Sequence, residues 1–194
     1  MFSGIVKTTG AVTWVRQYGK ERRVGIRPPA RWKLKPGESI SVEGVCSTVQ
    51  KVNGGSFEVT YMPETLRKTT LSGLQSKSRV NLERSLTLNS LIGGHLVQGH
   101  VDVVGRIVSI RPEETSKIYT FEIPRRLTRY LIEKGSVAID GISLTVVDLG
   151  GLHFSVSLLD YTLRHTTLGA KGVGDSVNIE VDVLSKYVAK LLGK

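Results

Sequence analysis

Hydrophobic residues in this chain recur in short runs that alternate with polar residues and end at glycine. Two such runs, residues 47–52 (STVQKV) and 56–62 (SFEVTYM), flank a glycine-rich turn, and residues 143–149 and 152–159 repeat the arrangement. Alternation with a period of two is typical of β-strands with one buried face, and short glycine-rich connections are typical of hairpins. The pattern therefore predicts two β-hairpins at equivalent places in the two halves of the chain.

The two halves are related by an internal duplication. At an offset of 97 residues, positions 44–83 and 141–180 align without a gap, and fifteen of the forty pairs are identical. After a small shift of register the similarity extends to the opening segments, residues 1–12 and 96–107. A repeat of this length is too long for one element of a solenoid, so each copy is expected to form a compact domain. We expect one domain over residues 1–95 and a second over 96–183.

Many short strands with few helices predict an all-β fold in which each copy is a small closed barrel. Short helices are expected at residues 29–34 (PARWKL) and 124–135 (PRRLTRYLIEKG), because each segment opens with proline. Residues 184–194 differ, since Leu184, Tyr187, Val188, Leu191 and Leu192 have the spacing of one helical face. They predict a C-terminal α-helix whose apolar stripe packs on the body of the protein or on neighbouring subunits.

Composition narrows the function classes. The net charge is +10, but the excess lies in residues 1–95, where 15 basic residues face 6 acidic ones, and the basic residues are scattered with few aromatics between them. Nucleic-acid binding is therefore not the favoured interpretation, although a barrel that binds oligonucleotides remains an alternative. No apolar run is long enough for a membrane span, and the first residues lack secretory signal features, so a cytoplasmic location is expected. The single cysteine, Cys46, excludes an intramolecular disulfide.

Two histidines, His95 and His100, lie in the segment GGHLVQGHVD. Residues five apart diverge on a strand and on a helix alike, so the spacing argues against a shared metal ion. His100 aligns with Ile5 and is expected on the opening strand of the second barrel, either as a buried structural histidine or as a functional one. We expect no metal site at this pair.

The polar positions that differ between the copies are candidates for chemistry. Cys46 and Thr48 align with Ser143 and Thr145, and each pair shares one face of a strand because side chains alternate. Such a pair beside a glycine can bind a ligand that lies against the backbone. The alternative is that these hydroxyls satisfy local backbone groups at the ends of hairpins.

In the order of its motifs the chain resembles the riboflavin synthase family. The motifs are MFSGIV, GVCSTV paired with DGISLTVV, ETLRKTTL paired with TLRHTTL, GGHLVQGHVD, and VNIEVD before the terminal helix. The resemblance implies two six-stranded Greek-key β-barrels, a C-terminal helix at residues 184–194 for trimer contacts, and a homotrimer. It also implies the dismutation of two 6,7-dimethyl-8-ribityllumazine molecules to riboflavin and 5-amino-6-(ribitylamino)uracil by transfer of a four-carbon unit. This reaction requires no cofactor.

The resemblance also implies two lumazine sites. The first comprises Gly4, Ile5, Val6, Ser39, Cys46, Ser47, Thr48, Thr60, Tyr61, Met62, Pro63, Glu64 and Thr65. The second comprises Gly99, His100, Val101, Lys134, Ser143, Leu144, Thr145, Leu158, Leu159, Asp160, Tyr161, Thr162 and Leu163. In the family the working site lies between the first barrel of one subunit and the second barrel of its neighbour.

For the chemistry we expect His100 and Ser143 near the proton-transfer step and Cys46 with Thr48 beside the acceptor. Asp182, which aligns with Ser85, is expected to handle a proton or a hydrogen bond. This chain departs from the family pattern at Asp160 and Tyr161, on one edge of the second pocket, and at Glu43 and Ser47, at the first pocket. The competing interpretation is a non-catalytic antenna protein that binds lumazine or flavin without turnover.

Overall fold

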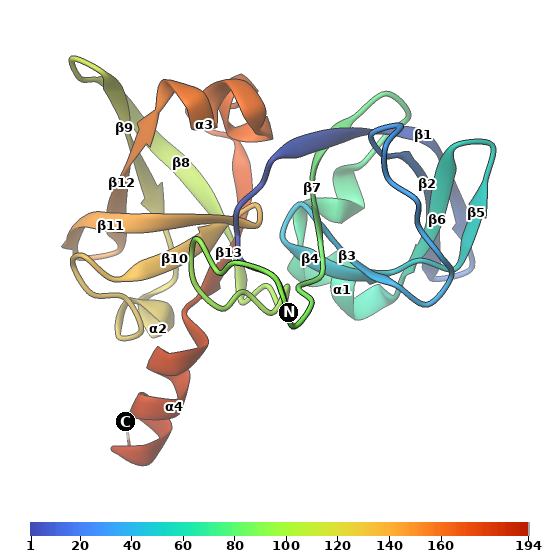
Figure 1. Cartoon of the computed structure of the whole chain (residues 1–194). Coiled ribbons are helices and arrows are strands. Elements are labelled where there is room, and N and C mark those ends of the chain that lie inside the picture. Colours follow the sequence, from blue (N-terminus) through green and yellow to red (C-terminus); the bar gives the residue numbers. More distant parts are fainter. Residues whose placement is uncertain (194) are drawn as a thin grey trace.

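The computed structural model describes residues 1–193 as two β-barrels that lie side by side, with a helix that projects from the second (Figure 1). Lys194, the last residue of the helix predicted over 184–194, lies outside the described residues. The first half contains β1 (Thr8–Tyr18), β2 (Glu21–Arg27), β3 (Ser39–Val42), β4 (Val45–Thr48), β5 (Lys51–Asn53), β6 (Ser56–Tyr61), α1 (Pro63–Lys68), the 3-10 helix η1 (Thr70–Gly73) and β7 (Arg79–Arg84). The second contains β8 (Val103–Pro112), β9 (Ser116–Glu122), α2 (Arg125–Thr128), β10 (Ser136–Ile139), β11 (Ile142–Gly150), β12 (His153–Leu159), α3 (Asp160–His165), η2 (Thr167–Ala170), β13 (Ser176–Val181) and the projecting α4 (Val183–Leu191).

The duplicated all-β fold is confirmed, with one difference in strand count. In the second half six strands close a barrel in the order β10-β11-β12-β9-β8-β13. The first half, named the first barrel by its equivalence to the second, forms a seven-stranded sheet that hydrogen bonds do not close, in the order β4-β3-β7-β1-β2-β6-β5. Its two ends, β4 and β5, are separated only by Val49 and Gln50, whereas β11 runs through the equivalent corner with a register shift between Val146 and Asp148. The same bend is thus a bulge in one copy and a strand break in the other.

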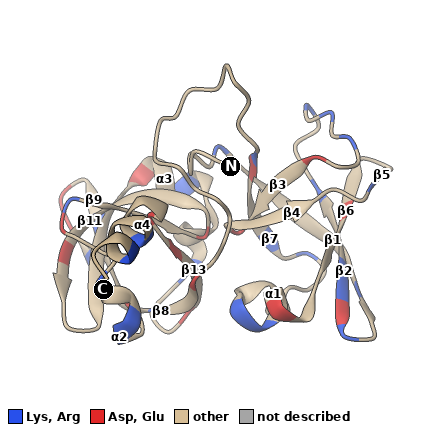
Figure 2. Cartoon of the chain, turned by 90° about the horizontal axis from the view of Figure 1, so that it is seen from below, with Lys and Arg blue, Asp and Glu red and all other residues tan. Residues whose placement is uncertain are grey.

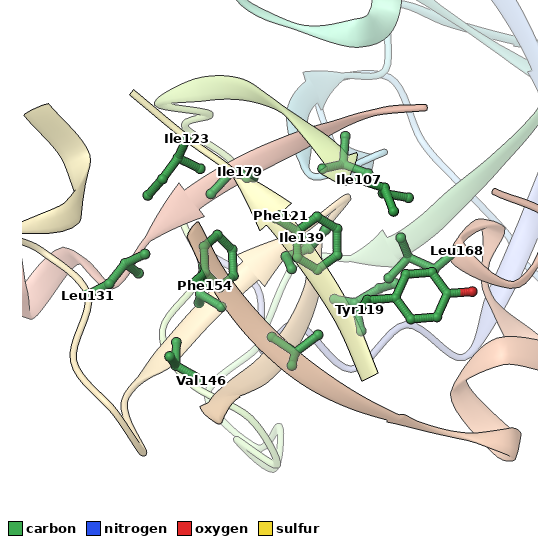
Figure 3. Packing of buried hydrophobic residues seen from close by; sticks show 14 of the residues in the cluster. Ile107, Tyr119, Phe121, Ile123, Leu131, Ile139, Val146, Phe154, Leu168 and Ile179 are labelled. Atoms are coloured by element: carbon green, nitrogen blue, oxygen red, sulfur yellow. The ribbon is translucent and has the colours of Figure 1, made fainter. Parts of the chain in front are cut away.

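Each barrel encloses its own core. The second core is built from inward side chains of all six strands, and Figure 3 shows its aromatic centre, where Phe121 and Phe154 lie 5.3 Å apart between ring centroids. The first core contains no such stack; it is mainly aliphatic around Phe57 and Tyr61. In β6 buried and half-buried residues alternate along the strand, as the hydrophobic pattern predicted.

One expected helix is absent and another is shorter than expected. Residues 29–34 form a turn closed by a hydrogen bond from the Trp32 N–H to the Pro29 carbonyl, and no helix. Prolines 28, 29 and 36 bracket the segment, and the residue before a proline avoids helical geometry, so only one turn fits. Of residues 124–135, only Arg125–Thr128 is α-helical.

The C-terminal helix is confirmed as α4. Its N-cap is Asp182, whose carboxylate accepts a hydrogen bond from the Leu184 N–H at 2.9 Å. The apolar residues that predicted the helix remain exposed in the single chain; they are Leu184, Tyr187, Val188, Leu191 and Leu192. The stripe therefore does not pack fully on the body of its own chain.

The two barrels meet backbone to backbone at a pair of equivalent glycines. Gly44 and Gly141 both have φ near +80°, and a Cβ on Gly44 would lie 2.5 Å from the Gly141 backbone nitrogen. Around them Asn81 donates to the Asp140 carbonyl and Asn178 donates to the Glu43 carbonyl, at 3.0 and 2.8 Å. The junction is therefore nearly two-fold symmetric and has no room for side chains at its centre.

A buried ionisable cluster breaks this symmetry. The Glu43 carboxylate accepts from the Asn81 N–H at 2.5 Å and from the Thr167 hydroxyl at 3.0 Å. The Lys171 ammonium lies 2.6 Å from Asp140 but 3.9 Å from Glu43. Burial, followed by the charge of Asp140, raises the pKa of Glu43 to about 8, although Lys171 opposes the effect. One lysine thus serves two buried carboxyl groups.

Replacing Glu43 by glutamine is expected to reduce the pH dependence of folding stability. A carboxyl group whose pKa is raised on folding stabilises the native state at low pH, and this contribution is lost as the pH rises from its unfolded value of 4.5 through about 8. Glu43→Gln should therefore gain stability relative to the wild type across that range, by on the order of 1–3 kcal/mol at pH 9. Urea unfolding at pH 5, 7 and 9 measures the difference. Parallel stability curves for the two chains would contradict the prediction.

Candidate functional site

The opening segments of the two copies cross between the barrels. The Gly4 carbonyl accepts a hydrogen bond from the Ser143 N–H in the second barrel at 2.8 Å, and the Gly99 carbonyl accepts one from the Cys46 N–H in the first barrel at 2.9 Å. Consistent with this exchange, Val6 lies in the second core and Val101 packs against the first. Gly4 thus contacts the second barrel, whereas Ile5 lines a cavity with Leu82 and Arg84 of the first. The assignment of these segments to the two lumazine sites stays a prediction. The Gly99, His100, Val101 segment lies against the first barrel, because each opening segment reaches its own first strand across the other barrel.

A cavity of about 420 Å³ opens in the first barrel beside Cys46. It is bounded by Glu21, Arg23, Cys46, Ser47, Thr48, Gln50, Thr60, Tyr61, Met62 and Thr65. Seven of these ten residues belong to the predicted first site. Cys46 is half-buried and Thr48 exposed, whereas Val45 and Ser47 are buried, so strand alternation presents the thiol and the hydroxyl on one face as predicted.

The floor of this cavity is polar. Ser47, whose hydroxyl donates to the Val45 carbonyl, lies 3.2 Å from the Tyr61 hydroxyl. Burial raises the pKa of Tyr61, so the phenol remains a neutral hydrogen-bonding group. At the rim the Arg23 guanidinium lies 4.0 Å from Glu58. The cavity therefore combines a neutral hydroxyl pair inside with a cation at its mouth.

In the second barrel the residue at the position of Cys46 is Ser143, and its partner is His95. The His95 Nδ1 atom lies 2.7 Å from the Ser143 hydroxyl. Burial lowers the pKa of His95, and the charge of Asp182 partly offsets this. The other ring nitrogen, Nε2, is buried and has no hydrogen-bond partner among the described residues. A histidine that stays neutral near pH 7 and retains a free nitrogen can accept or deliver a proton.

His100 does not occupy the predicted place. It is exposed, it precedes β8 and is not part of a strand, and its N–H donates to Glu180 at 2.9 Å. Since Gly99 is bonded to Cys46, His100 follows a residue held against the first barrel. The histidine in contact with Ser143 is therefore His95 and not His100. The repeat gave no signal for His95, because its counterpart would precede Met1.

The remaining predicted residues lie around the two strands. Ser39 pairs with Thr48 across β3 and β4, and Lys134 is exposed in the turn before β10. Pro63 and Glu64 begin α1, where Glu64 is exposed and paired with Arg67 and Lys68. In the second copy Leu158 is fully buried in the core, whereas Leu159, Asp160 and Tyr161 are exposed; Leu144, Thr162 and Leu163 are half-buried and Thr145 is exposed. No structural observation assigns these residues to a ligand.

Asp160 and Tyr161, which depart from the family pattern, are the first two residues of α3. Asp160 is paired with Arg164, and the Tyr161 ring stacks on His165 with centroids 4.0 Å apart. In α1 the acidic Glu64 aligns with Tyr161. The stacked pair Tyr161 and His165 thus stands where the first copy has the Glu64–Lys68 ion pair.

The distribution of charge and of metal-ligating side chains gives no sign of a polyanion or metal site among the described residues. The Lys and Arg residues, blue in Figure 2, are spread over many elements of both halves and are not gathered on one element. Within residues 1–193 no three His, Cys, Asp or Glu side chains are grouped as metal ligands. None of the helices described is long and apolar enough to cross a membrane.

The chain matches the lumazine binding domain family twice, over residues 3–85 and 98–182. The riboflavin synthase of Mycobacterium bovis is 46% identical over 197 residues, which is 99% of this chain and 98% of that protein. The riboflavin synthase of Actinobacillus pleuropneumoniae is 41% identical over 195 residues, covering 100% and 91%.

Among solved structures, LumP complexed with riboflavin is similar with a TM-score of 0.86 and 24% identity, covering 93% of this chain and 99% of that one. LumP complexed with 6,7-dimethyl-8-(1'-D-ribityl) lumazine gives a TM-score of 0.83 at the same identity and coverage. At this identity the likeness supports the fold alone. The full-length sequence matches go further: the chain belongs to the riboflavin synthase family of proteins with two lumazine binding domains.

Proposed function

We propose that this chain is a riboflavin synthase, a transferase that converts two molecules of 6,7-dimethyl-8-ribityllumazine to riboflavin and 5-amino-6-(ribitylamino)uracil. The observation that carries the proposal is the end-to-end match to enzymes of that name at up to 46% identity, against 24% for the LumP structures. The duplicated barrel suits a reaction between two copies of one molecule. Holding both in reacting orientation can contribute on the order of 7–11 kcal/mol to the barrier reduction.

The two strands equivalent by duplication offer different groups to the two molecules. In the first barrel Cys46 and Thr48 face a cavity large enough for a heterocycle. In the second, Ser143 is paired with a histidine whose pKa is lowered by burial. We assign His95, through Nε2, to the transfer of a proton from the acidic ring methyl of one lumazine, with Ser143 orienting the imidazole. Cys46 and Thr48 act on the acceptor molecule.

A homotrimer is part of the proposal. The apolar residues of α4 are exposed in the single chain, with Leu191 85% and Leu184 60% accessible. A groove of about 470 Å³ between α4 and the second barrel, lined by Tyr130 and Ile132 among others, continues this surface. Apolar surface of this kind is typical of subunit contacts. We propose that assembly brings the first barrel of one subunit to the second barrel of its neighbour. We also propose that the protein is located in the cytoplasm.

Incubation of the purified chain with 6,7-dimethyl-8-ribityllumazine tests the proposed function. We expect riboflavin to form with a stoichiometry of one riboflavin for two lumazines consumed, followed by absorbance and chromatography. A His95→Gln, Ser143→Ala double variant is the matched control for contaminating enzyme. Tight lumazine binding without any riboflavin would favour the antenna protein instead.

The pH dependence of turnover tests the assignment of His95. Because burial lowers its pKa, the acid limb of the kcat profile should lie below pH 6.5, where the ring becomes protonated and loses its role as a base. Asp182→Asn should move that limb to still lower pH, since the Asp182 charge raises the pKa of His95, and asparagine can still cap α4. His95→Gln should reduce kcat by about 100-fold or more. An unchanged rate in His95→Gln would exclude it from the mechanism.

Removal of residues 184–194 should weaken the assembly and lower turnover together, because it deletes the exposed apolar residues of α4. Analytical ultracentrifugation and the riboflavin assay at several protein concentrations measure both effects. Lys190→Glu, an exposed change on the same helix, is the control that should leave both unchanged. A truncated chain that remained trimeric and fully active would refute the role of α4.

A further inference from the structure

Two buried carboxylates occupy equivalent positions that the proposed chemistry does not use. Glu83 lies near the end of β7 and Glu180 near the end of β13, and they are 9% and 3% exposed. The repeat aligns them, as the last residues of RVNLE and SVNIE. A buried carboxylate is costly unless its oxygens are hydrogen-bonded, so each requires a partner set.

Each carboxylate binds the backbone of its own copy's opening segment. The Glu83 oxygens accept from the Ser3 N–H at 2.8 Å, the Ser3 hydroxyl at 2.6 Å and the Gly4 N–H at 3.0 Å. The Glu180 oxygens accept from the N–H groups of Gln98, Gly99 and His100 at 2.7, 2.9 and 2.9 Å. Each carboxyl group thus accepts three hydrogen bonds from its segment, and together they fix the position of that segment.

The same two glycines are bonded on their other side to the opposite barrel. Gly4 lies so close to Ser143 that a Cβ on the glycine would be 2.6 Å from the serine Cβ, and a Cβ on Gly99 would be 2.8 Å from that of Cys46. Both glycines have positive φ, +73° and +79°, so their backbone geometry is restricted as well. Because each glycine is held on both sides, moving the Gly99 segment would move Cys46 in β4, and moving the Gly4 segment would move Ser143 in β11.

We propose that Glu83 and Glu180 are positioning residues that act across the molecule: Glu180, in the second barrel, holds Cys46 of the first, and Glu83, in the first barrel, holds Ser143 of the second. Each opening segment transmits the position of one barrel's last strand to the other barrel's ligand-bearing strand. The two ligand sites of one chain are thereby coupled. The link to lumazine chemistry rests on the proposed function, whereas the crossed mechanical link does not.

Hydrogen–deuterium exchange at single residues in the full chain tests this link. The Cys46 amide is bonded to Gly99 and the Ser143 amide to Gly4, so their exchange rates report the two contacts. Glu180→Gln keeps the shape but turns an NH₂ group toward N–H donors. It should speed exchange of the Cys46 amide by about threefold to tenfold and leave the Ser143 amide unchanged. Glu83→Gln should do the reverse.

The crossed pattern separates positioning from general destabilisation. A merely structural role would speed both amides equally in each variant, and a local role would speed the amide in the mutated barrel; either result overturns the proposal. Glu122→Gln, exposed on β9, is the control for loss of charge and should change neither amide. If a glutamine variant fails to fold, Glu180→Asp and Glu83→Asp, which keep the charge but shorten the side chain, should give the same crossed pattern.

Turnover provides a second readout in the same variants. Both should show a lower kcat, because a displaced Cys46 or Ser143 is misaligned with bound lumazine. A crossed exchange pattern in a chain that makes no riboflavin would keep the positioning role and refute the proposed function. Riboflavin formation without the crossed pattern would do the opposite.

Discussion

The backbone contact between Gly44 and Gly141 is the constraint on which the arrangement of the molecule depends. Their positive φ angles and the absence of any Cβ let the two barrels meet backbone to backbone. Each glycine lies in the turn before the strand that carries Cys46 or Ser143, β4 or β11, so the contact brings the starts of these two strands together. At this separation a segment of a few residues can span both barrels. Larger residues at the two turns would push the barrels apart and break the asparagine bridges on either side.

The crossing of the opening segments makes the two domains less independent than the repeat suggests. Val6 completes the second core and Val101 covers the first, so each barrel takes apolar surface from the other copy. Phe2 and Val97 are bridged to each other and are buried with Ala138 between the barrels. Because the first residues of each copy pack against the other copy, the two halves depend on each other for part of their buried apolar surface.

The hairpins and the terminal helix could be predicted because they depend on the local spacing of apolar and polar residues. The repeat could be predicted because the two halves still align without a gap over forty positions. Alternation along β4 even placed Cys46 and Thr48 on one face. The partner of Ser143 could not be predicted in this way, because the contact with His95 depends on where a segment 48 residues away crosses. The repeat alignment paired Gly4 with Gly99 correctly but contains no information on which barrel each glycine touches. Glu83 and Glu180 did carry a signal, since an acidic residue recurs at the end of an apolar strand in both copies, but burial was needed to interpret it.

Divergence of the two copies explains why a duplicated barrel can treat two identical molecules differently. The first copy has the hydroxyl pair of Ser47 and Tyr61, whereas the repeat places Leu144 and Leu158 at the same positions of the second copy. Ser143 of the second copy contacts a histidine from outside the repeat, whereas the first copy has the free thiol of Cys46 at that position. A reaction in which one lumazine loses carbon atoms and the other gains them requires such unequal surroundings. Two identical sites would stabilise both molecules in the same state, so the proposed division of roles depends on these departures from internal symmetry.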